Sequence, residues 1–153
     1  MKIFVRRGSE SDCEILALLE SEARSSLSHL RGGERLAESV KLISPNWPLA
    51  LKNAGLCIFV AGLDDVVMGF VVVRIGNSDT GRVATIEQVF VTNDVRGLGV
   101  GDSLISASVA WAKSQNLNAL DGFALPGDRE TKNLYERAGM VARLITVSTD
   151  LRD

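Results

Sequence analysis

The chain has 153 residues, of which 46% are hydrophobic and 24% are charged, and its formal net charge at pH 7 is −2. This profile predicts one soluble domain, residues 1–153, and argues against nucleic-acid binding and against a membrane span, since the longest apolar run covers only residues 66–73. Two cysteines, one histidine and an N-terminus without signal-peptide features predict a cytoplasmic protein with no metal site and no disulfide framework.

The N-terminal half predicts a strand, two helices and a hairpin of strands. Residues 2–7 form the first strand, and Ser9 or Ser11 caps a helix whose apolar residues recur at helical spacing. A second helix is predicted over residues 33–43, followed by a loop over residues 44–48 with two prolines. Strands over 56–63 and 66–75 are separated by Asp64 and Asp65, which predicts a hairpin.

The C-terminal half alternates strands and helices. A turn over residues 76–81 precedes a strand over 83–91, and a glycine-rich segment then precedes a helix over 102–115. A strand over 119–125, a helix from Asp128 to Gly139 and an alternating strand over 140–149 complete the chain. This order predicts an α/β domain with a mixed sheet and helices on both faces.

The segment Arg96-Gly97-Leu98-Gly99-Val100-Gly101 joins the strand over 83–91 to the following helix. Unpaired N–H groups at a helix N-terminus bind anions, and glycines let a phosphate approach the backbone closely, so the segment predicts a phosphate site. A Walker A loop would need a lysine where Gly101-Asp102-Ser103 has none, and Asp102 takes the last glycine position of a dinucleotide fingerprint.

The remaining pattern is Arg/Gln-x-x-Gly-x-Gly/Ala, filled by Arg96, Gly99 and Gly101. Here the chain resembles the GNAT N-acetyltransferase superfamily, whose acetyl-CoA pyrophosphate loop has this form. Residues 133–140, Asn-Leu-Tyr-Glu-Arg-Ala-Gly-Met, are similar to the family's Leu-Tyr-Glu-x-x-Gly-Phe signature, and residues 5–12 are similar to its first strand and helix cap. The resemblance implies a GNAT-like acyl-CoA N-acyltransferase fold, with a central mixed, mostly antiparallel sheet flanked by helices.

The resemblance also implies acetyl-CoA as co-substrate, no metal, and direct transfer of the acetyl group to a primary amine in a ternary complex. In the family, backbone N–H groups near Val89 polarise the thioester carbonyl where two strands diverge. Asp128 stands where the family often has asparagine, and an ionised aspartate cannot donate to pantetheine, so Asn133 is the expected donor. The implied acetyl-CoA residues are Val89, Phe90, Val91, Arg96, Gly97, Leu98, Gly99, Val100, Gly101, Asp102, Ser103 and Asn133.

Two residues are the candidates for acid–base chemistry. An alkylammonium of pKa about 10.4 must lose a proton before it attacks, which costs about 4 to 5 kcal/mol at pH 7. Glu87, nine residues before Arg96, is the candidate base, with a solvated strand glutamate as the alternative. Tyr135, the only tyrosine, is the family's usual donor to the departing thiolate, with packing against the sheet as the alternative.

The acceptor stays open between a small amine metabolite, an antibiotic, a peptide N-terminus and a lysine. A cationic acceptor would be favoured by acidic residues such as Glu34, Glu38, Asp64 and Asp79. A rival function is a non-catalytic acyl-CoA-binding or sensing module, which would keep the glycine-rich segment without needing Glu87 or Tyr135. An open strand edge would also allow a homodimer.

Overall fold

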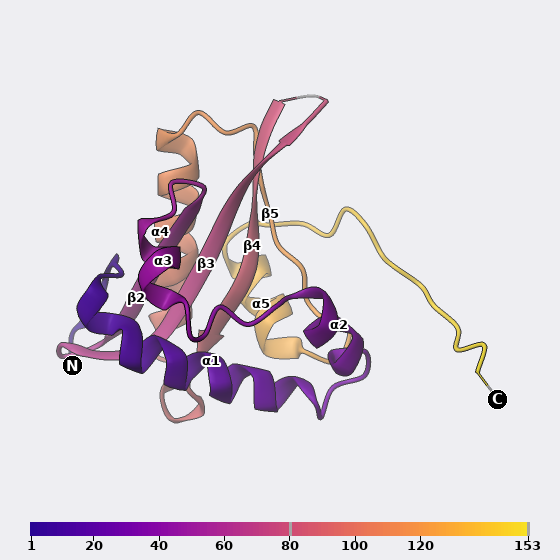
Figure 1. Cartoon of the computed structure of the whole chain (residues 1–153), viewed down its shortest axis with the longest axis horizontal. Coiled ribbons are helices and arrows are strands. Elements are labelled where there is room, and N and C mark those ends of the chain that lie inside the picture. The colour runs from indigo at the N-terminus through magenta and orange to yellow at the C-terminus, as the bar shows by residue number, and fades with distance from the viewer. Residues whose placement is uncertain (80, 153) are drawn as a thin grey trace.

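The computed structural model describes residues 1–79 and 81–152, and its centre is one five-stranded sheet (Figure 1). The strands follow chain order across the sheet: β1 (Ile3–Arg7), β2 (Leu56–Leu63), β3 (Val66–Ser78), β4 (Gly81–Val91) and β5 (Ala119–Asp121). The first four pair antiparallel, and β5 pairs parallel with β4. The predicted mixed, mostly antiparallel sheet is therefore confirmed.

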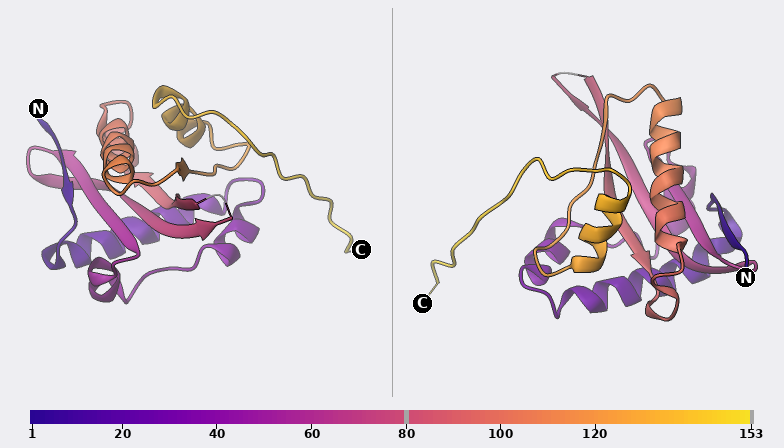
Figure 2. Two further views of the ribbon diagram at one scale, coloured as in Figure 1. Left: turned by 90° about the horizontal axis from the view of Figure 1, so that it is seen from above. Right: turned by 180° about the vertical axis from the view of Figure 1, so that it is seen from behind.

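Helices cover both faces of this sheet (Figure 2). One face carries α1 (Cys13–Leu27) and α3 (Trp47–Lys52), and the other carries α4 (Val100–Ser114) with α5 (Arg129–Arg137) beside it. The short α2 (Gly33–Ser39) follows α1, and two 3₁₀ turns cover Glu10–Asp12 and Asn93–Val95.

Each face of the sheet has its own buried cluster. On the α1 side, Leu16 packs with Trp47 and Phe70, whose rings meet edge to face with centroids 5.7 Å apart. On the α4 side, Leu104 and Ile105 pack against the opposite face of β2, β3 and β4. Strands covered on both faces need apolar residues at successive positions, which explains the continuous apolar runs in the sequence.

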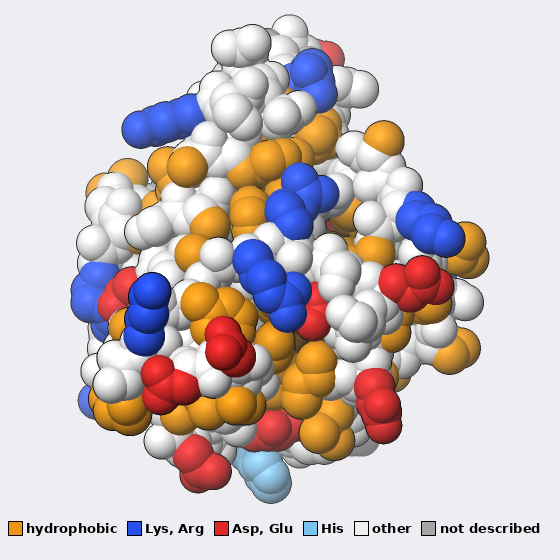
Figure 3. Space-filling model, turned by 90° about the vertical axis from the view of Figure 1, so that its left-hand side faces the viewer, with side chains coloured by type: hydrophobic (Ala, Val, Ile, Leu, Met, Phe, Trp, Pro, Cys, Tyr) orange, Lys and Arg blue, Asp and Glu red, His pale blue; other side chains and the backbone are white. Residues whose placement is uncertain are grey.

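The surface carries both signs of charge. On the face in Figure 3, Lys and Arg side chains are interspersed with Asp and Glu and do not form one basic patch. Within the two described ranges, no helix combines the length and the hydrophobicity that crossing a lipid bilayer requires.

Two predictions in the N-terminal half were wrong. The second helix ends at Ser39, because Val40 already has an extended backbone. Arg24 of α1 donates to the carbonyls of Ala37 and Val40, at 2.7 and 2.5 Å, and so satisfies groups exposed at the helix end. The predicted loop contains α3, in which Pro48 takes the second helical position. Proline is tolerated there because the first turn needs no backbone N–H donor.

The C-terminal half differs from prediction at its end. Strand β5 stops at Asp121, and the predicted strand over 140–149 is instead an extended tail that leaves the domain (Figure 1). A strand needs a neighbour for its N–H and C=O groups, and no ladder of the described sheet extends to this tail. In the predicted turn over 76–81, β3 continues to Ser78 and Thr80 lies outside the described residues.

Glu20 of α1 is a buried carboxylate that ties three elements together. It is 1% exposed and accepts hydrogen bonds from the N–H groups of Ile43 and Ser44, the Ser44 hydroxyl and the Gln88 amide, at 2.8 to 3.0 Å. Burial acts to raise the pKa of Glu20, but these donors outweigh it and hold the pKa below its ordinary value. Glu20 thereby fixes the position of Gln88 on β4.

Replacing Glu20 with glutamine is expected to lower the free energy of unfolding by about 2 kcal/mol at pH 7, because the new NH₂ group faces donors. The pKa of Glu20 in the folded protein lies below its unfolded value of about 4.3. The stability that the Glu20 carboxylate adds is therefore complete above about pH 4.3 and is lost as the pH falls through the folded pKa. Urea unfolding at neutral and acid pH measures this, with exposed Glu14→Gln on the same helix as control. An equal difference at both pH values would contradict the prediction.

Candidate active site

A β-bulge in β4 sets the directions of the side chains around the site. Val72 pairs with Gln88 and the next pair joins Val73 to Ile86, so Glu87 is the additional residue on β4. Ile86 and Val89, three residues apart, both pack on the α4 side, whereas strict alternation would place them on opposite faces. The bulge therefore reverses the alternation and directs Gln88 toward Glu20 of α1.

Strands β4 and β5 diverge after only three residue pairs, the last of which joins Thr85 to Asp121. Beyond it, the described part of β4 continues to Val91 without a β5 partner. A cavity of about 1030 Å³ opens here, lined by β4, the N-terminal ends of α4 and α5, and the end of α1 with α2. This volume is in the range of pockets that hold cofactor-sized ligands.

The glycine-rich loop presents a row of free backbone donors to this cavity. Gly97 and Gly99 have φ angles of +84° and +93°, in the left-handed region that favours glycine. Among the described residues, no acceptor pairs with the N–H groups of Gly97 or of the four consecutive residues from Gly99 to Asp102. Asp102 accepts from Nε of Arg137 on α5 at 2.9 Å, so its charge next to these donors is compensated.

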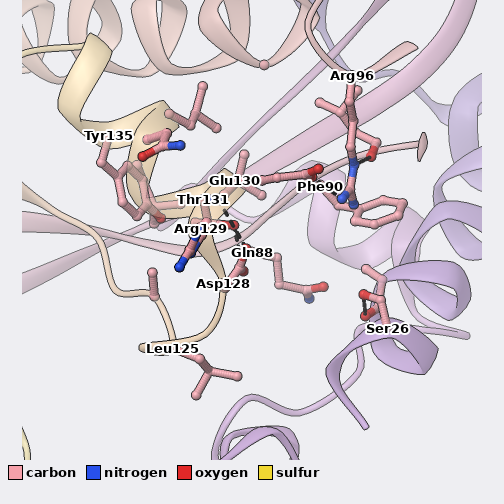
Figure 4. Close-up of a pocket in the computed structure, with 18 of the residues that line it drawn as sticks. Ser26, Gln88, Phe90, Arg96, Leu125, Asp128, Arg129, Glu130, Thr131 and Tyr135 are labelled. Carbon is pink, nitrogen blue, oxygen red and sulfur yellow. Dashed lines mark hydrogen bonds and ion pairs between the residues drawn. The ribbon is translucent and has the colours of Figure 1, made fainter. Parts of the chain in front are cut away.

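The Arg96 side chain crosses the opening between β4 and α5 (Figure 4). Its Nε donates to the Val91 carbonyl at 3.0 Å, and its guanidinium carbon lies 5.5 Å from the centre of the Phe90 ring. Its Nη1 forms an ion pair with Glu130 on α5. Arg96 thus occupies only the Val91 end of the free edge of β4.

Tyr135 lies on the opposite side of the cavity from Arg96 (Figure 4). Its ring packs on Gly122, where an added Cβ would lie 2.7 Å from the ring carbon Cζ, and its hydroxyl donates to the Phe123 carbonyl at 3.4 Å. Burial raises the pKa of the phenol, and the nearby charge of Asp128 raises it further. The hydroxyl therefore keeps its proton at neutral pH.

Asp128 caps α5, as the sequence predicted, by accepting from the Thr131 N–H group at 3.1 Å and from the Thr131 hydroxyl at 2.7 Å.

Glu87 borders both the main cavity and a smaller one of about 330 Å³ beside it. Its carboxylate lies 2.5 Å from Nε of Arg74, and its side chain is 29% exposed. The two predicted acid–base residues, Glu87 and Tyr135, therefore line one cavity.

Most of the predicted acetyl-CoA residues also line this cavity: Val89, Phe90, Val91, Arg96, Gly97, Gly99, Gly101, Asp102 and Asn133. Three do not. Leu98 is 44% exposed, Val100 is buried in the core, and the Ser103 hydroxyl donates to the Val100 carbonyl.

Other residues of the site were missed by the sequence reasoning. Arg137 and Glu130 line the cavity as partners of Asp102 and Arg96, which lie 35 and 34 residues away, and no local pattern signals such pairs. The acidic residues expected to attract a cationic acceptor lie outside both cavities: Glu34, Glu38, Asp64 and Asp79. In residues 1–79 and 81–152, no group of three His, Cys, Asp or Glu side chains is arranged to hold a metal ion.

Several solved structures share this fold. A mutant of the BH1408 protein from Bacillus halodurans matches with a TM-score of 0.81 and 18% identity, over 97% of this chain and 99% of that one. The aminoglycoside N-acetyltransferase AAC(6')-Iy, solved with the bisubstrate analog CoA-S-monomethyl-acetylneamine, matches over all of both chains with a TM-score of 0.73 and 19% identity. A ribosomal-protein-alanine N-acetyltransferase from Brucella melitensis biovar Abortus 2308 matches with a TM-score of 0.71 and 17% identity, over 98% and 100%.

No curated protein matches the chain in sequence. The model of the acetyltransferase (GNAT) family, however, matches residues 16–140. This range contains the bulged strand β4, the glycine-rich loop and the whole of α5 with Tyr135. The chain therefore belongs to the acetyltransferase (GNAT) family.

Proposed function

We propose that this protein is an acetyl-CoA-dependent N-acetyltransferase that acts on a primary amine by direct transfer within a ternary complex. One observation carries the proposal: the free N–H groups of the loop, the open edge of β4 and the Tyr135 hydroxyl border the same cavity. A module that only binds an acyl-CoA would need the first two features but has no use for a partly buried proton donor beside them. Solved structures of the same fold contain CoA or a CoA bisubstrate analog.

The residues present fit acetyl-CoA as follows. The pyrophosphate is a dianion that suits the free N–H groups from Gly99 to Asp102 at the positive end of the α4 dipole. Arg137 adds a cation beside this helix end. The pantetheine amides suit the open edge of β4, and the Asn133 amide, which lines the same cavity, supplies both a donor and an acceptor.

The proposed reaction needs a base and an acid at its two ends. Glu87, directly or through a water, takes a proton from the ammonium, and the neutral amine attacks the thioester carbonyl. Backbone N–H groups at Val89 to Val91 stabilise the negative charge that forms on the carbonyl oxygen. The C–S bond then breaks and the acetyl group stays on nitrogen. The Tyr135 hydroxyl donates a hydrogen bond to the departing thiolate, and the second proton that the nitrogen loses passes, through this hydroxyl or solvent, to the sulfur to give the CoA thiol.

Two assays on the purified protein test this proposal. Calorimetric titration with acetyl-CoA should give micromolar binding, and thiol release should then depend on an added primary amine. Binding without release for any amine favours the non-catalytic acyl-CoA-binding or sensing alternative. No binding at millimolar acetyl-CoA overturns the proposal.

Glu130 competes with the ligand for Arg96. The Glu130→Gln variant is expected to bind acetyl-CoA about twofold to fivefold more tightly, because it frees the guanidinium and removes a negative charge from the cavity. The gain should shrink at high salt, since the Glu130 side chain is 60% exposed and its charge is screened. Calorimetry at low and high salt measures the effect, with Glu136→Gln outside the cavity as control. Weaker binding in Glu130→Gln would mean that the ion pair supports the site.

We also propose that the tail over residues 140–152 pairs with a second copy of the chain to form a homodimer. Its large apolar side chains are between 74% and 88% exposed, more than a lone soluble domain normally leaves in water: Val141, Leu144, Ile145, Val147 and Leu151. Arg143 pairs with Asp121 at 2.9 Å, so the tail starts beside the end of β5, the strand at the edge of the sheet. Edge strands are templates for pairing with another chain.

Light scattering should therefore give the full chain twice its monomer mass. Deleting residues 141–153 should give a monomer, and so should the double variant Ile145→Asp, Val147→Asp, which keeps the chain length. Arg129→Gln, a charge change away from the tail, serves as the control and should remain a dimer. A monomeric full chain at micromolar concentration would contradict the proposal.

A further inference from the structure

We infer that the acceptor is a primary amine that bears a single positive charge and is carried on an apolar arm. This inference rests on the proposed function and concerns the end of the cavity away from the glycine-rich loop. We call this end the acceptor wall. It consists of six apolar side chains from α1, α2, the segment after each helix and the segment that follows β5: Leu27, Leu30, Leu36, Val40, Phe123 and Leu125.

Two segments far apart in sequence contact each other at the acceptor wall and bound the cavity there. A Cβ added to Gly32 would lie 3.3 Å from Cδ2 of Leu125, and one added to Gly127 would lie 3.8 Å from Cδ2 of Leu30. The loop after α1 therefore meets the loop before α5 and bounds the cavity there. Phe123 is still 40% exposed, so apolar surface remains for a ligand to cover.

The charges around the cavity do not suit a polycation. Four carboxylates line it, and three are already paired with arginines: Glu87 with Arg74, Asp102 with Arg137, and Glu130 with Arg96. Four arginines line the same cavity, so its formal charges balance: Arg24, Arg96, Arg129 and Arg137. A ligand with several positive charges binds where carboxylates are in excess, and this cavity has no such excess.

One carboxylate remains for a single ammonium. Asp128 lines the cavity and forms no ion pair with the described residues; in Figure 4 it lies with Gln88 between Leu125 and Arg96. The Gln88 NH₂ group donates to Glu20, and no donor in the described ranges pairs with its amide oxygen, which is therefore available to accept. Asp128 and Gln88 together can receive one ammonium, whose proton then passes to Glu87, the neighbour of Gln88 on β4, while its substituent lies against the acceptor wall.

The test compares three amines under saturating acetyl-CoA: 2-phenylethylamine, ethylamine without the apolar arm, and spermidine as a polycation. We expect kcat/KM for 2-phenylethylamine to exceed that of each other amine by about tenfold or more. Leu30→Asp should remove most of this preference while leaving acetyl-CoA affinity unchanged. Leu49→Asp, at a leucine that is 70% exposed and lies outside the cavity, should behave as the unmodified protein.

The outcomes separate the two levels of the proposal. Failure to bind acetyl-CoA overturns the proposed function. If the protein binds acetyl-CoA but acetylates spermidine as well as or better than 2-phenylethylamine, only the inference about the acceptor is overturned. If no amine in the set is turned over, calorimetric titration of the protein–CoA complex decides: tighter binding of 2-phenylethylamine than of spermidine supports the inference, and the reverse order overturns it.

Discussion

Replacing Gly99 with glutamate should raise the Kd for acetyl-CoA by about a hundredfold or more, equivalent to about 2.7 kcal/mol. Gly99 has φ of +93°, and an added Cβ would lie 3.0 Å from Cδ1 of Ile3, so the substitution strains the loop. The new carboxylate would also stand among the free N–H groups that we assign to the pyrophosphate. Both effects act on the same contact between loop and phosphate.

Gly139→Glu is the matched control for this experiment. Gly139 follows α5 with φ of +80°, its added Cβ would have no neighbour within 4 Å, and it does not line the cavity. It therefore carries the same backbone cost and the same new charge without touching the site. Calorimetry should show unchanged binding for Gly139→Glu and binding weakened by about a hundredfold or more for Gly99→Glu, with thermal melting to verify that both variants fold. Equal binding by the two variants would mean that the loop does not hold the phosphates.

Features that depend on short stretches of sequence were predicted well. The apolar runs over 56–63 and 66–75 gave the β2–β3 hairpin, because strands buried on both faces need apolar residues throughout. The Asp128 cap followed from the preference of aspartate for the N-terminus of a helix. The glycines between β4 and α4 located the N-terminus that borders the cavity, because left-handed backbone favours glycine.

Features that depend on distant partners were not predictable. Alternation over residues 140–149 expresses a tendency to form a strand but does not supply the neighbouring strand that would pair with it. The bulge at Glu87 arises from the register between β3 and β4, which no spacing within β4 reveals. The electrostatics of the cavity depend on Arg96–Glu130 and Asp102–Arg137, and each pair joins two elements that only the fold brings together.

The second large effect is expected at the other end of the cavity. Replacing Tyr135 with phenylalanine should lower kcat by about a hundredfold or more and leave the Kd for acetyl-CoA unchanged. The ring would keep its packing on Gly122, so only the hydroxyl and its bond to the Phe123 carbonyl are lost. Calorimetry and thiol-release kinetics on the same preparation separate binding from turnover.

The pH dependence identifies what the hydroxyl does. Burial and the charge of Asp128 raise the pKa of Tyr135, so the phenol stays protonated through neutral and mildly alkaline pH and turnover should not fall there. Because full transfer from such a phenol to a thiolate of pKa about 8.5 is uphill, most of its benefit is a hydrogen bond to the charge forming on sulfur.

Glu87→Gln should behave differently from Tyr135→Phe. Without the carboxylate, the amine must lose its proton to solvent, so kcat/KM should keep rising as the pH approaches the amine pKa of about 10.4. Tyr135→Phe should lower kcat at every pH without changing the shape of the pH profile, because the missing hydroxyl acts on the sulfur and not on the amine nitrogen. A pH profile of Tyr135→Phe that matches Glu87→Gln would place both residues at the amine, and an unchanged kcat would mean that Tyr135 only packs on Gly122.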